Sequence, residues 1–172
     1  MTSAEARIEI HVGDITRLPV TAIANAANEA LAPGGGVCGA IFRAAGPGLA
    51  EECRALRGCM TGDCRLTSGY GLSAQWILHC VGPVWHGGGR GEARLLASCY
   101  TQALAIAAER KFESVAFPAI STGIYGYPPS EAATAAVGAI RAHLATHEWP
   151  RRVVLVAFDE PAAGPLRAAL EA

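Results

Sequence analysis

A glycine-rich segment near the N-terminus carries the residues best suited to bind an anion. Asn25-Ala-Ala-Asn28 is followed by Glu-Ala-Leu-Ala-Pro33 and then by the glycines at 34–36. Glycines let backbone N–H groups approach a ligand closely, and a helix starting right after them adds unpaired N–H groups and a partial positive charge. Phosphate is the commonest ligand of such a turn. We expect Asn25 and Asn28 on its rim, where they could bind sugar hydroxyls. A turn held by local Asn hydrogen bonds is the alternative.

Further polar and glycine residues follow other predicted strands. A second loop contains Ser121-Thr-Gly-Ile-Tyr-Gly-Tyr-Pro128, and Phe158-Asp159 follows the last strand. Asp14 follows the first strand, where its carboxylate could cap a turn or accept a hydrogen bond from the exocyclic amine of a base. Ligands of parallel sheets bind outside the carboxyl ends of the strands. These features therefore converge on one rim and predict a nucleotide-like ligand.

The elements that must position these residues alternate between strands and helices. Alternating apolar residues predict a strand at 8–12, and apolar runs predict strands at 22–24, 77–81, 114–117 and 153–158. A short strand at 65–68 is an open option within the polar, turn-rich stretch at 58–71. Apolar residues three and four apart predict helices at 37–44, 49–56 and 92–110, a helix with Ser130 as N-cap that extends to Leu144, and a short helix at 165–169. The glycine-rich stretch at 85–91 is expected to be a flexible surface loop.

This alternation predicts an α/β fold in a single domain spanning residues 1–172, with helices on both faces of a mostly parallel sheet. No long crossover separates the first strand from the second. We therefore expect these two strands to be antiparallel neighbours.

Composition excludes several classes of protein. The chain has 172 residues, of which 51% are hydrophobic and 17% charged, as in a packed globular protein. Its net charge of −1 argues against a general nucleic-acid binder, since such proteins carry an excess of Lys and Arg. No apolar run approaches the roughly 18 residues of a membrane span, and residues 1–7 lack the apolar core of a signal peptide. We expect a cytoplasmic protein without a membrane partner.

The six cysteines do not form a metal-binding pattern. No Cys-x-x-Cys pair occurs, and the closest spacing, Cys59-x4-Cys64, has no suitable histidine beside it. We therefore expect no metal. Reduced thiols packed as small hydrophobic side chains are the expectation for a cytosolic chain.

The motifs resemble those of a known family. Gly13-Asp-Ile-Thr16, Asn25-Ala-Ala-Asn28, Gly34-Gly-Gly-Val37, Gly82-Pro83 and Ser121 to Pro128 occur in the order and spacing of a macrodomain, and look most like the MacroD-type ADP-ribose hydrolases. The resemblance extends from about Ile8 to Leu170. It implies a three-layer α/β/α fold with a mixed, mostly parallel central sheet. It also implies that the chain binds ADP-ribose and ADP-ribosylated proteins without a cofactor. A monomer is the expectation for a domain of this size.

The resemblance also assigns individual residues to the ligand. Asp14 would accept from the adenine amino group, with Ile15 beside it. Phe158 would pack against the adenine ring, or, as the alternative, in the core. Asn28 would hold the distal ribose near the scissile bond, and Asn25 would shape the loop or touch the ligand. The diphosphate would lie between Gly35, Gly36 and Val37 on one side and Ser121, Thr122, Gly123, Ile124 and Tyr125 on the other, with Tyr125 also against the distal ribose.

The chain departs from the MacroD-type pattern at two positions. Cys38 and Phe42 stand where those enzymes have aspartate and histidine. The resemblance implies hydrolysis of ADP-ribose from acidic side chains and deacetylation of O-acetyl-ADP-ribose. Asn28, Cys38 and Gly36 are the candidate catalytic residues. Water would attack either the ester carbonyl or the anomeric carbon of the distal ribose.

The loss of the acid at Cys38 keeps a second interpretation open, a reader module that binds ADP-ribose without turnover. A module for RNA or poly(ADP-ribose) is a third, against which the near-neutral charge argues. Cys38 as a covalent nucleophile would need a base, and the sequence identifies none.

Overall fold

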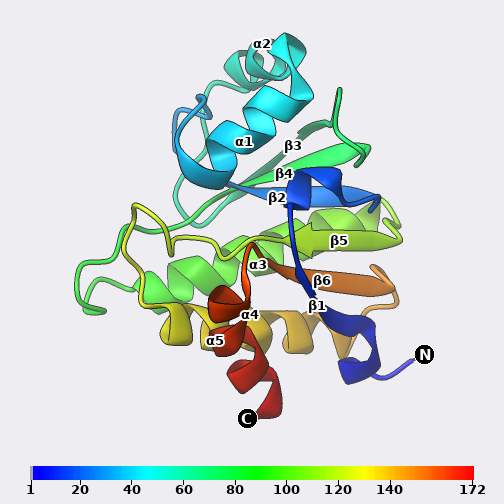
Figure 1. Cartoon of the computed structure of the whole chain (residues 1–172), viewed down its shortest axis with the longest axis vertical. Helices are drawn as coiled ribbons and strands as arrows, with labels where there is room; N and C mark the ends of the chain where they lie inside the picture. Colours follow the sequence, from blue (N-terminus) through cyan, green and yellow to red (C-terminus); the bar gives the residue numbers. More distant parts are fainter. Residues whose placement is uncertain (1) are drawn as a thin grey trace.

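A six-stranded sheet forms the middle layer of the computed structural model, which describes residues 2–172 (Figure 1). In sheet order, the strands are β1 (Ile8–Val12), β6 (Arg152–Ala157), β5 (Ser114–Phe117), β2 (Ala22–Ala27), β4 (Trp76–Val81) and β3 (Cys64–Ser68). All neighbouring strands are parallel except β3 and β4, which are antiparallel. The predicted mixed, mostly parallel sheet is therefore confirmed.

Helices cover both faces of this sheet. One face packs against α1 (Gly36–Ala45) and α2 (Pro47–Leu56), and the other against α3 (Glu92–Glu109), α4 (Pro129–Leu144) and α5 (Glu160–Glu171). Successive strand residues point to opposite faces, so Ala22 and Ala24 of β2 enter the α3–α5 core while Ile23 enters the α1–α2 core. Both cores bury continuous apolar surface, which explains the apolar strands that the sequence contains.

The first strand does not lie where we expected it. β1 is parallel to β6 at the edge of the sheet, with Ile8 opposite Val153, and it does not pair with β2 (Figure 1). β1 exposes Glu9 and His11, which an edge position tolerates, whereas β5 is buried along its whole length and takes a central position. Because β1 and β2 run in the same direction, the connection at 13–21 must cross three strand spacings, roughly 14 Å, and return roughly 17 Å along the strands. This span of about 22 Å is within the reach of about 30 Å that nine residues have.

Two helix boundaries also differ from the sequence-based expectation. α4 begins at Pro129 with Pro128 at the N-cap, so Ser130 lies inside the first turn. Proline suits the first helical position, here Pro129, because the N–H of that residue would have no partner within the helix. α5 begins at Glu160, well before the predicted start at 165, because the Asp159 carboxylate caps it by accepting from the N–H of Ala162 at 2.9 Å.

All six cysteines are buried with free thiols, so their predicted packing as small side chains is confirmed. Within residues 2–172, the structure contains no helix with the length and apolarity to cross a membrane.

Candidate functional site

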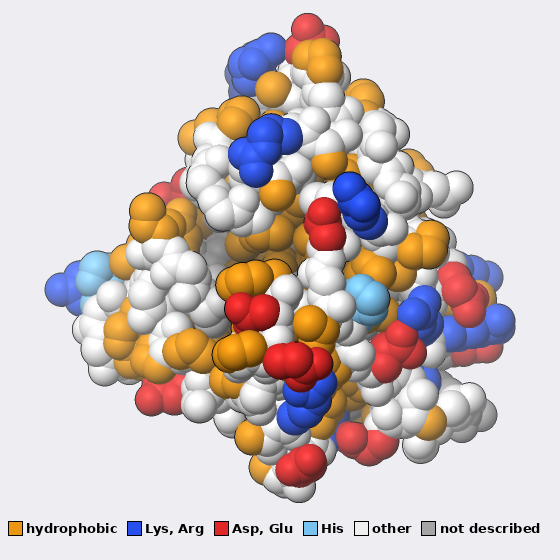
Figure 2. Space-filling view, viewed as in Figure 1, with side chains coloured by type: hydrophobic (Ala, Val, Ile, Leu, Met, Phe, Trp, Pro, Cys, Tyr) orange, Lys and Arg blue, Asp and Glu red, His pale blue; other side chains and the backbone are white. Residues whose placement is uncertain are grey.

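A cavity of about 420 Å³ opens at the carboxyl ends of the central strands. It is large enough for a small organic ligand. Figure 2 shows a hollow on this face bordered mainly by apolar side chains and backbone, with charged groups scattered rather than gathered. None of the lining residues is charged; they are Ala26 to Asn28, Gly34 to Cys38, Gly82, Ala119 to Ser121 and Gly123 to Tyr125.

The start of α1 forms one wall of the cavity. Its first backbone N–H groups, from Gly36 onward, precede the helical hydrogen-bond ladder and have no partner within it. The glycine turn packs tightly on the helix, because a Cβ atom at Gly39 would lie 2.4 Å from the carbonyl oxygen of Gly34. Only glycine at position 39 permits this approach. The wall therefore presents N–H groups and the positive end of the helix dipole to the cavity.

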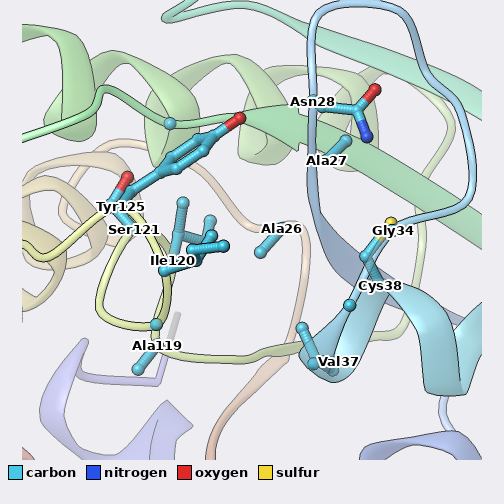
Figure 3. A pocket seen from close by; sticks show the side chains of 15 residues that line it. Ala26, Ala27, Asn28, Gly34, Val37, Cys38, Ala119, Ile120, Ser121 and Tyr125 are labelled. Carbon is cyan, nitrogen blue, oxygen red and sulfur yellow. The ribbon is translucent and has the colours of Figure 1, made fainter.

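The loop after β5 forms the opposite wall (Figure 3). Among the hydrogen bonds of residues 2–172, none uses the N–H groups of Gly123, Ile124 or Tyr125. Ser121 adopts a positive φ of 70°, and its buried hydroxyl has no partner in the described structure. A Cβ atom at Gly82 would lie 2.1 Å from this hydroxyl oxygen, so glycine is needed there. Donors thus flank the cavity on both sides without a single Lys or Arg.

Asn28 lines the cavity and also holds its own loop. Its Oδ1 accepts from the N–H of Ala32 at 3.0 Å, and its Nδ2 donates to the carbonyl of Ala32 at 2.9 Å. An amide NH₂ has two hydrogens, so the second N–H of Asn28 is free for a ligand. The Asn28 side chain can therefore hold the loop at Ala32 and contact a ligand in the cavity at the same time.

Cys38 lies at the first turn of α1 with its sulfur near the cavity (Figure 3). Its thiol donates to the Ala32 carbonyl at 3.7 Å, and its sulfur accepts from Asn25 Nδ2 at 3.6 Å. Our expectation that Asn25 lies on the rim is wrong. β2 extends to Ala27, so Asn25 is a strand residue, fully buried beneath Cys38.

The opposite end of the site is more exposed. The hydrogen bond from the N–H of Gly13 to the carbonyl of Ala157, at 2.8 Å, brings Asp14 and Phe158 to the same edge of the sheet. Phe158 is 81% exposed, which excludes the alternative of core packing. Asp14 Oδ1 accepts from the N–H and the hydroxyl of Thr16, at 2.9 and 2.7 Å. These bonds lower the pKa of Asp14, the hydroxyl contributing most, and the carboxylate is ionised at neutral pH.

Comparison with known proteins identifies the family. The Macro domain model matches residues 24–136. The Macro domain-containing protein mll7730 of Mesorhizobium japonicum is 55% identical, over 95% of this chain and 93% of that protein. The chain is a macrodomain.

Two further relatives carry more specific names. A protein of Salmonella gallinarum named O-acetyl-ADP-ribose deacetylase is 47% identical over 91% of the present macrodomain and 90% of the relative. The macrodomain of Trypanosoma brucei in complex with ADP-ribose superposes with a TM-score of 0.90 at 39% identity, covering 95% of this chain and 69% of the other.

The structure brings most of the predicted site residues of this macrodomain around one cavity. Asn28, Gly35, Gly36, Val37, Ser121, Gly123, Ile124, Tyr125 and Cys38 line it. Asp14, Ile15, Thr122 and Phe158 lie outside its lining, and Asn25 lies beneath it. Thr122 instead donates its hydroxyl to the Ala119 carbonyl at 2.7 Å. Phe42 packs in the core, 9% exposed, so the second departure from the MacroD-type pattern does not face the cavity.

The sequence analysis did not identify Glu92, which supports the cavity wall through the stretch at 85–91. The N–H of Trp85 donates to the carbonyl of Tyr125 at 2.8 Å, which joins the glycine-rich stretch at 85–91 to the wall. Glu92 holds that stretch in turn, because its buried carboxylate accepts from the N–H groups of His86, Gly88 and Arg90 at 2.6–3.0 Å. The position of Glu92 directly after the glycine-rich stretch was the one feature of the sequence that could have indicated this role.

No carboxylate or imidazole is among the lining residues, so the cavity itself offers no strong general base. In the part of the chain that the structure describes, no three His, Cys, Asp or Glu side chains are grouped as metal ligands. The arrangement can bind an anion through N–H groups and position a water molecule near it.

Proposed function

We propose that this macrodomain binds ADP-ribose and hydrolyses ADP-ribose esters, in the manner of MacroD-type enzymes. Its substrates would be proteins mono-ADP-ribosylated on acidic side chains, O-acetyl-ADP-ribose, or both. We propose that it acts as a monomer in the cytoplasm. The observation that carries the proposal is the cavity between two rows of N–H donors, at the start of α1 and at residues 123–125, in a chain related to a named deacetylase and to an ADP-ribose complex.

The shape and charge of the site suit a diphosphate flanked by two sugars. Diphosphate charge would lie between the α1 N-terminus and the opposite loop, where backbone N–H groups and the helix dipole favour anions. Adenine would extend toward Asp14 and Phe158, and the distal ribose toward Asn28 and Tyr125. A carboxylate accepts well from an exocyclic amine, and an exposed ring offers a stacking surface.

In the proposed reaction a water molecule attacks the ester and the oxygen on the leaving side takes up a proton. The N–H of Gly36 would help to hold the water near the substrate's own diphosphate, and Asn28 would orient the distal ribose. The loop N–H groups would stabilise negative charge as it develops. Cys38 would lie beside the reacting atoms.

The decisive assay measures release and binding on one preparation. We expect wild-type protein to release ADP-ribose from a protein modified on glutamate and to bind free ADP-ribose by calorimetry. In H₂¹⁸O, attack at the carbonyl places ¹⁸O in the glutamate carboxylate, whereas attack at the anomeric carbon places it in the released ribose. Binding without release would support the reader interpretation instead, and absence of both would refute the proposal.

Asn28→Ala tests the residue that we place nearest to the scissile bond. We expect turnover to fall by about tenfold or more, because an interaction with the distal ribose that strengthens in the transition state is lost. Thermal unfolding is the control, since Asn28 also holds Ala32. An Asn28→Ala protein with wild-type turnover would contradict this role.

A further inference from the structure

Three polar side chains lie together inside the apolar layer between the sheet and α1–α2. Asn25 of β2 and His79 of β4 are opposite each other in register and have no exposed surface, and Thr67 of β3 is 1% exposed. The His79 ring packs against Phe42 of α1, with ring centroids 6.4 Å apart, and lies near Cys53 of α2. Burying polar groups is costly unless they are hydrogen-bonded. Asn25 Oδ1 has no partner in the described structure, so the contacts of Asn25 Nδ2 are what hold this amide.

The hydrogen-bond directions follow from the Thr67 end of this group. The Thr67 hydroxyl oxygen lies 3.1 Å from the Ser68 carbonyl and 2.9 Å from His79 Nε2. We infer that its one hydrogen is donated to the Ser68 carbonyl, which makes its oxygen the acceptor for His79 Nε2–H. His79 Nδ1 then carries a lone pair, which accepts from Asn25 Nδ2 at 3.2 Å. Burial lowers the pKa of His79 to about 4, so the ring is neutral at physiological pH and one nitrogen is an acceptor.

The same Asn25 amide reaches the candidate site. Its NH₂ group also donates to the Cys38 sulfur, which leaves the thiol hydrogen directed at the Ala32 carbonyl. That carbonyl is the one held by Asn28. A continuous hydrogen-bond chain therefore connects Thr67 of β3, buried between the sheet and the α1–α2 layer, to the loop that carries Asn28.

Asn25 donates in both directions, to His79 and to Cys38, and its NH₂ group cannot relay a proton between them. His79 therefore is no base for the Cys38 thiol. Its effect on the site comes through the orientation of the Asn25 amide.

We propose that His79 is a positioning residue: its Nδ1 lone pair fixes the Asn25 amide with N–H toward Cys38, and so holds the Cys38 thiol and the Asn28–Ala32 loop in register with the cavity. The effect on turnover rests on the proposed hydrolysis, whereas the orientation itself does not.

The first test is the tautomer of His79, measured on wild-type protein by long-range ¹H–¹⁵N NMR correlation. The expected result is the Nε2–H tautomer at neutral pH. An Nδ1–H tautomer would require Asn25 to present its carbonyl oxygen and would overturn the proposal. This readout needs no substrate, so it decides the matter even if wild-type protein shows no turnover and the proposed function fails.

The second test compares two variants in hydrolysis of O-acetyl-ADP-ribose. His79→Asn can place an amide oxygen close to the position of Nδ1, whereas His79→Leu has no acceptor. We expect kcat of the Asn variant within about threefold of wild type and kcat of the Leu variant at least about tenfold lower, with KM changed less than about threefold in both. Equal kcat in the Leu variant and wild type would overturn the proposal.

Cys53→Ala is the matched control, because Cys53 lies 3.8 Å from His79 Nε2 but outside the chain to Cys38. It removes a fully buried side chain and lowers stability, yet kcat should not change. A loss of kcat shared by this variant would mean that His79 acts only through core packing. Should the Leu variant fail to fold, the tautomer of His79 in wild-type protein still decides the proposed hydrogen-bond directions.

Discussion

At the scale of single residues, the candidate site is unusual for having a thiol where the MacroD-type pattern has an acid. Cys38 Sγ is held by Asn25 and directed at Ala32, so it is a fixed group in the wall. A thiol is a weaker acceptor of water hydrogens than a carboxylate. The effect of this weaker acceptor on catalysis can be tested by replacing the Cys38 side chain alone.

Cys38→Asp should raise turnover of the glutamate-linked substrate. A carboxylate there can accept a proton from water, and general bases contribute about 10²–10⁴-fold, so we expect an increase of about tenfold or more. Cys38→Asn is the control of equal shape without basicity and should show no increase. Initial rates of ADP-ribose release measure both, and an equal gain in the two variants would mean that basicity is not the cause. Undiminished activity of Cys38→Ala would show that the thiol takes no part in the chemistry.

Asp14 offers a second prediction, on affinity. Asp14→Asn keeps an oxygen that can accept from Thr16, but replaces the other carboxylate oxygen by a donor that cannot bind an exocyclic amine. We expect ADP-ribose to bind more weakly by about 1–3 kcal/mol, with little change in melting temperature. Calorimetric titration with ADP-ribose measures this loss. An unchanged Kd would rule out Asp14 as a contact of the base.

At the scale of elements, the start of α3 supports the cavity wall from outside, through the contacts of Glu92 with the stretch at 85–91. Burial alone would raise the pKa of Glu92, but the backbone N–H groups of His86, Gly88, Arg90 and Glu92 itself outweigh it and lower the pKa to about 2. The carboxylate therefore organises a stretch that the sequence predicted to be flexible.

Glu92→Gln should alter the response of stability to acid. The folded-state pKa is below the unfolded value of about 4.5, so Glu92 contributes stability that is complete above about pH 4.5 and is lost as pH falls toward 2. The variant should be less stable at pH 7, and its deficit should shrink between about pH 4.5 and pH 2. Thermal melts across this range measure the deficit. A deficit of constant size would contradict the pKa shift.

The elements also explain what the sequence could predict. Apolar spacing located five of the six strands and all five helices, with α5 predicted too short, because burial on one or two faces leaves a local pattern. The order of the strands leaves no local pattern in the sequence, since the pairing of β1 with β6 joins residues about 145 positions apart. Asn25 was misplaced for the same reason: its burial depends on Cys38 above it and His79 beside it, not on its neighbours in sequence. Glycine loops and Asn28 were predictable because their chemistry is local.

At the scale of the whole molecule, the candidate cavity and a buried arginine lie at opposite ends of the strands. The cavity lies at the carboxyl ends of the parallel strands. At the amino ends, the buried guanidinium of Arg7, just before β1, donates to the carbonyls of Leu144, Glu148 and Pro150, between α4 and β6. This contact connects the first strand to the last and has no part in the cavity.

Arg7→Met should therefore separate ligand binding from stability. Buried carbonyls that lose a charged donor cost about 1–3 kcal/mol each, so with partial access of water we expect a loss of about 3 kcal/mol in the free energy of unfolding. Arg151→Met is the control, because Arg151 is half-exposed in its ion pairs with Glu113 and Glu148 and should change stability by less than about 0.5 kcal/mol. Urea unfolding measures both variants, and ADP-ribose titration below the melting temperature should give the wild-type Kd for each. Weaker binding by folded Arg7→Met protein would show that the two ends of the strands are coupled through the sheet.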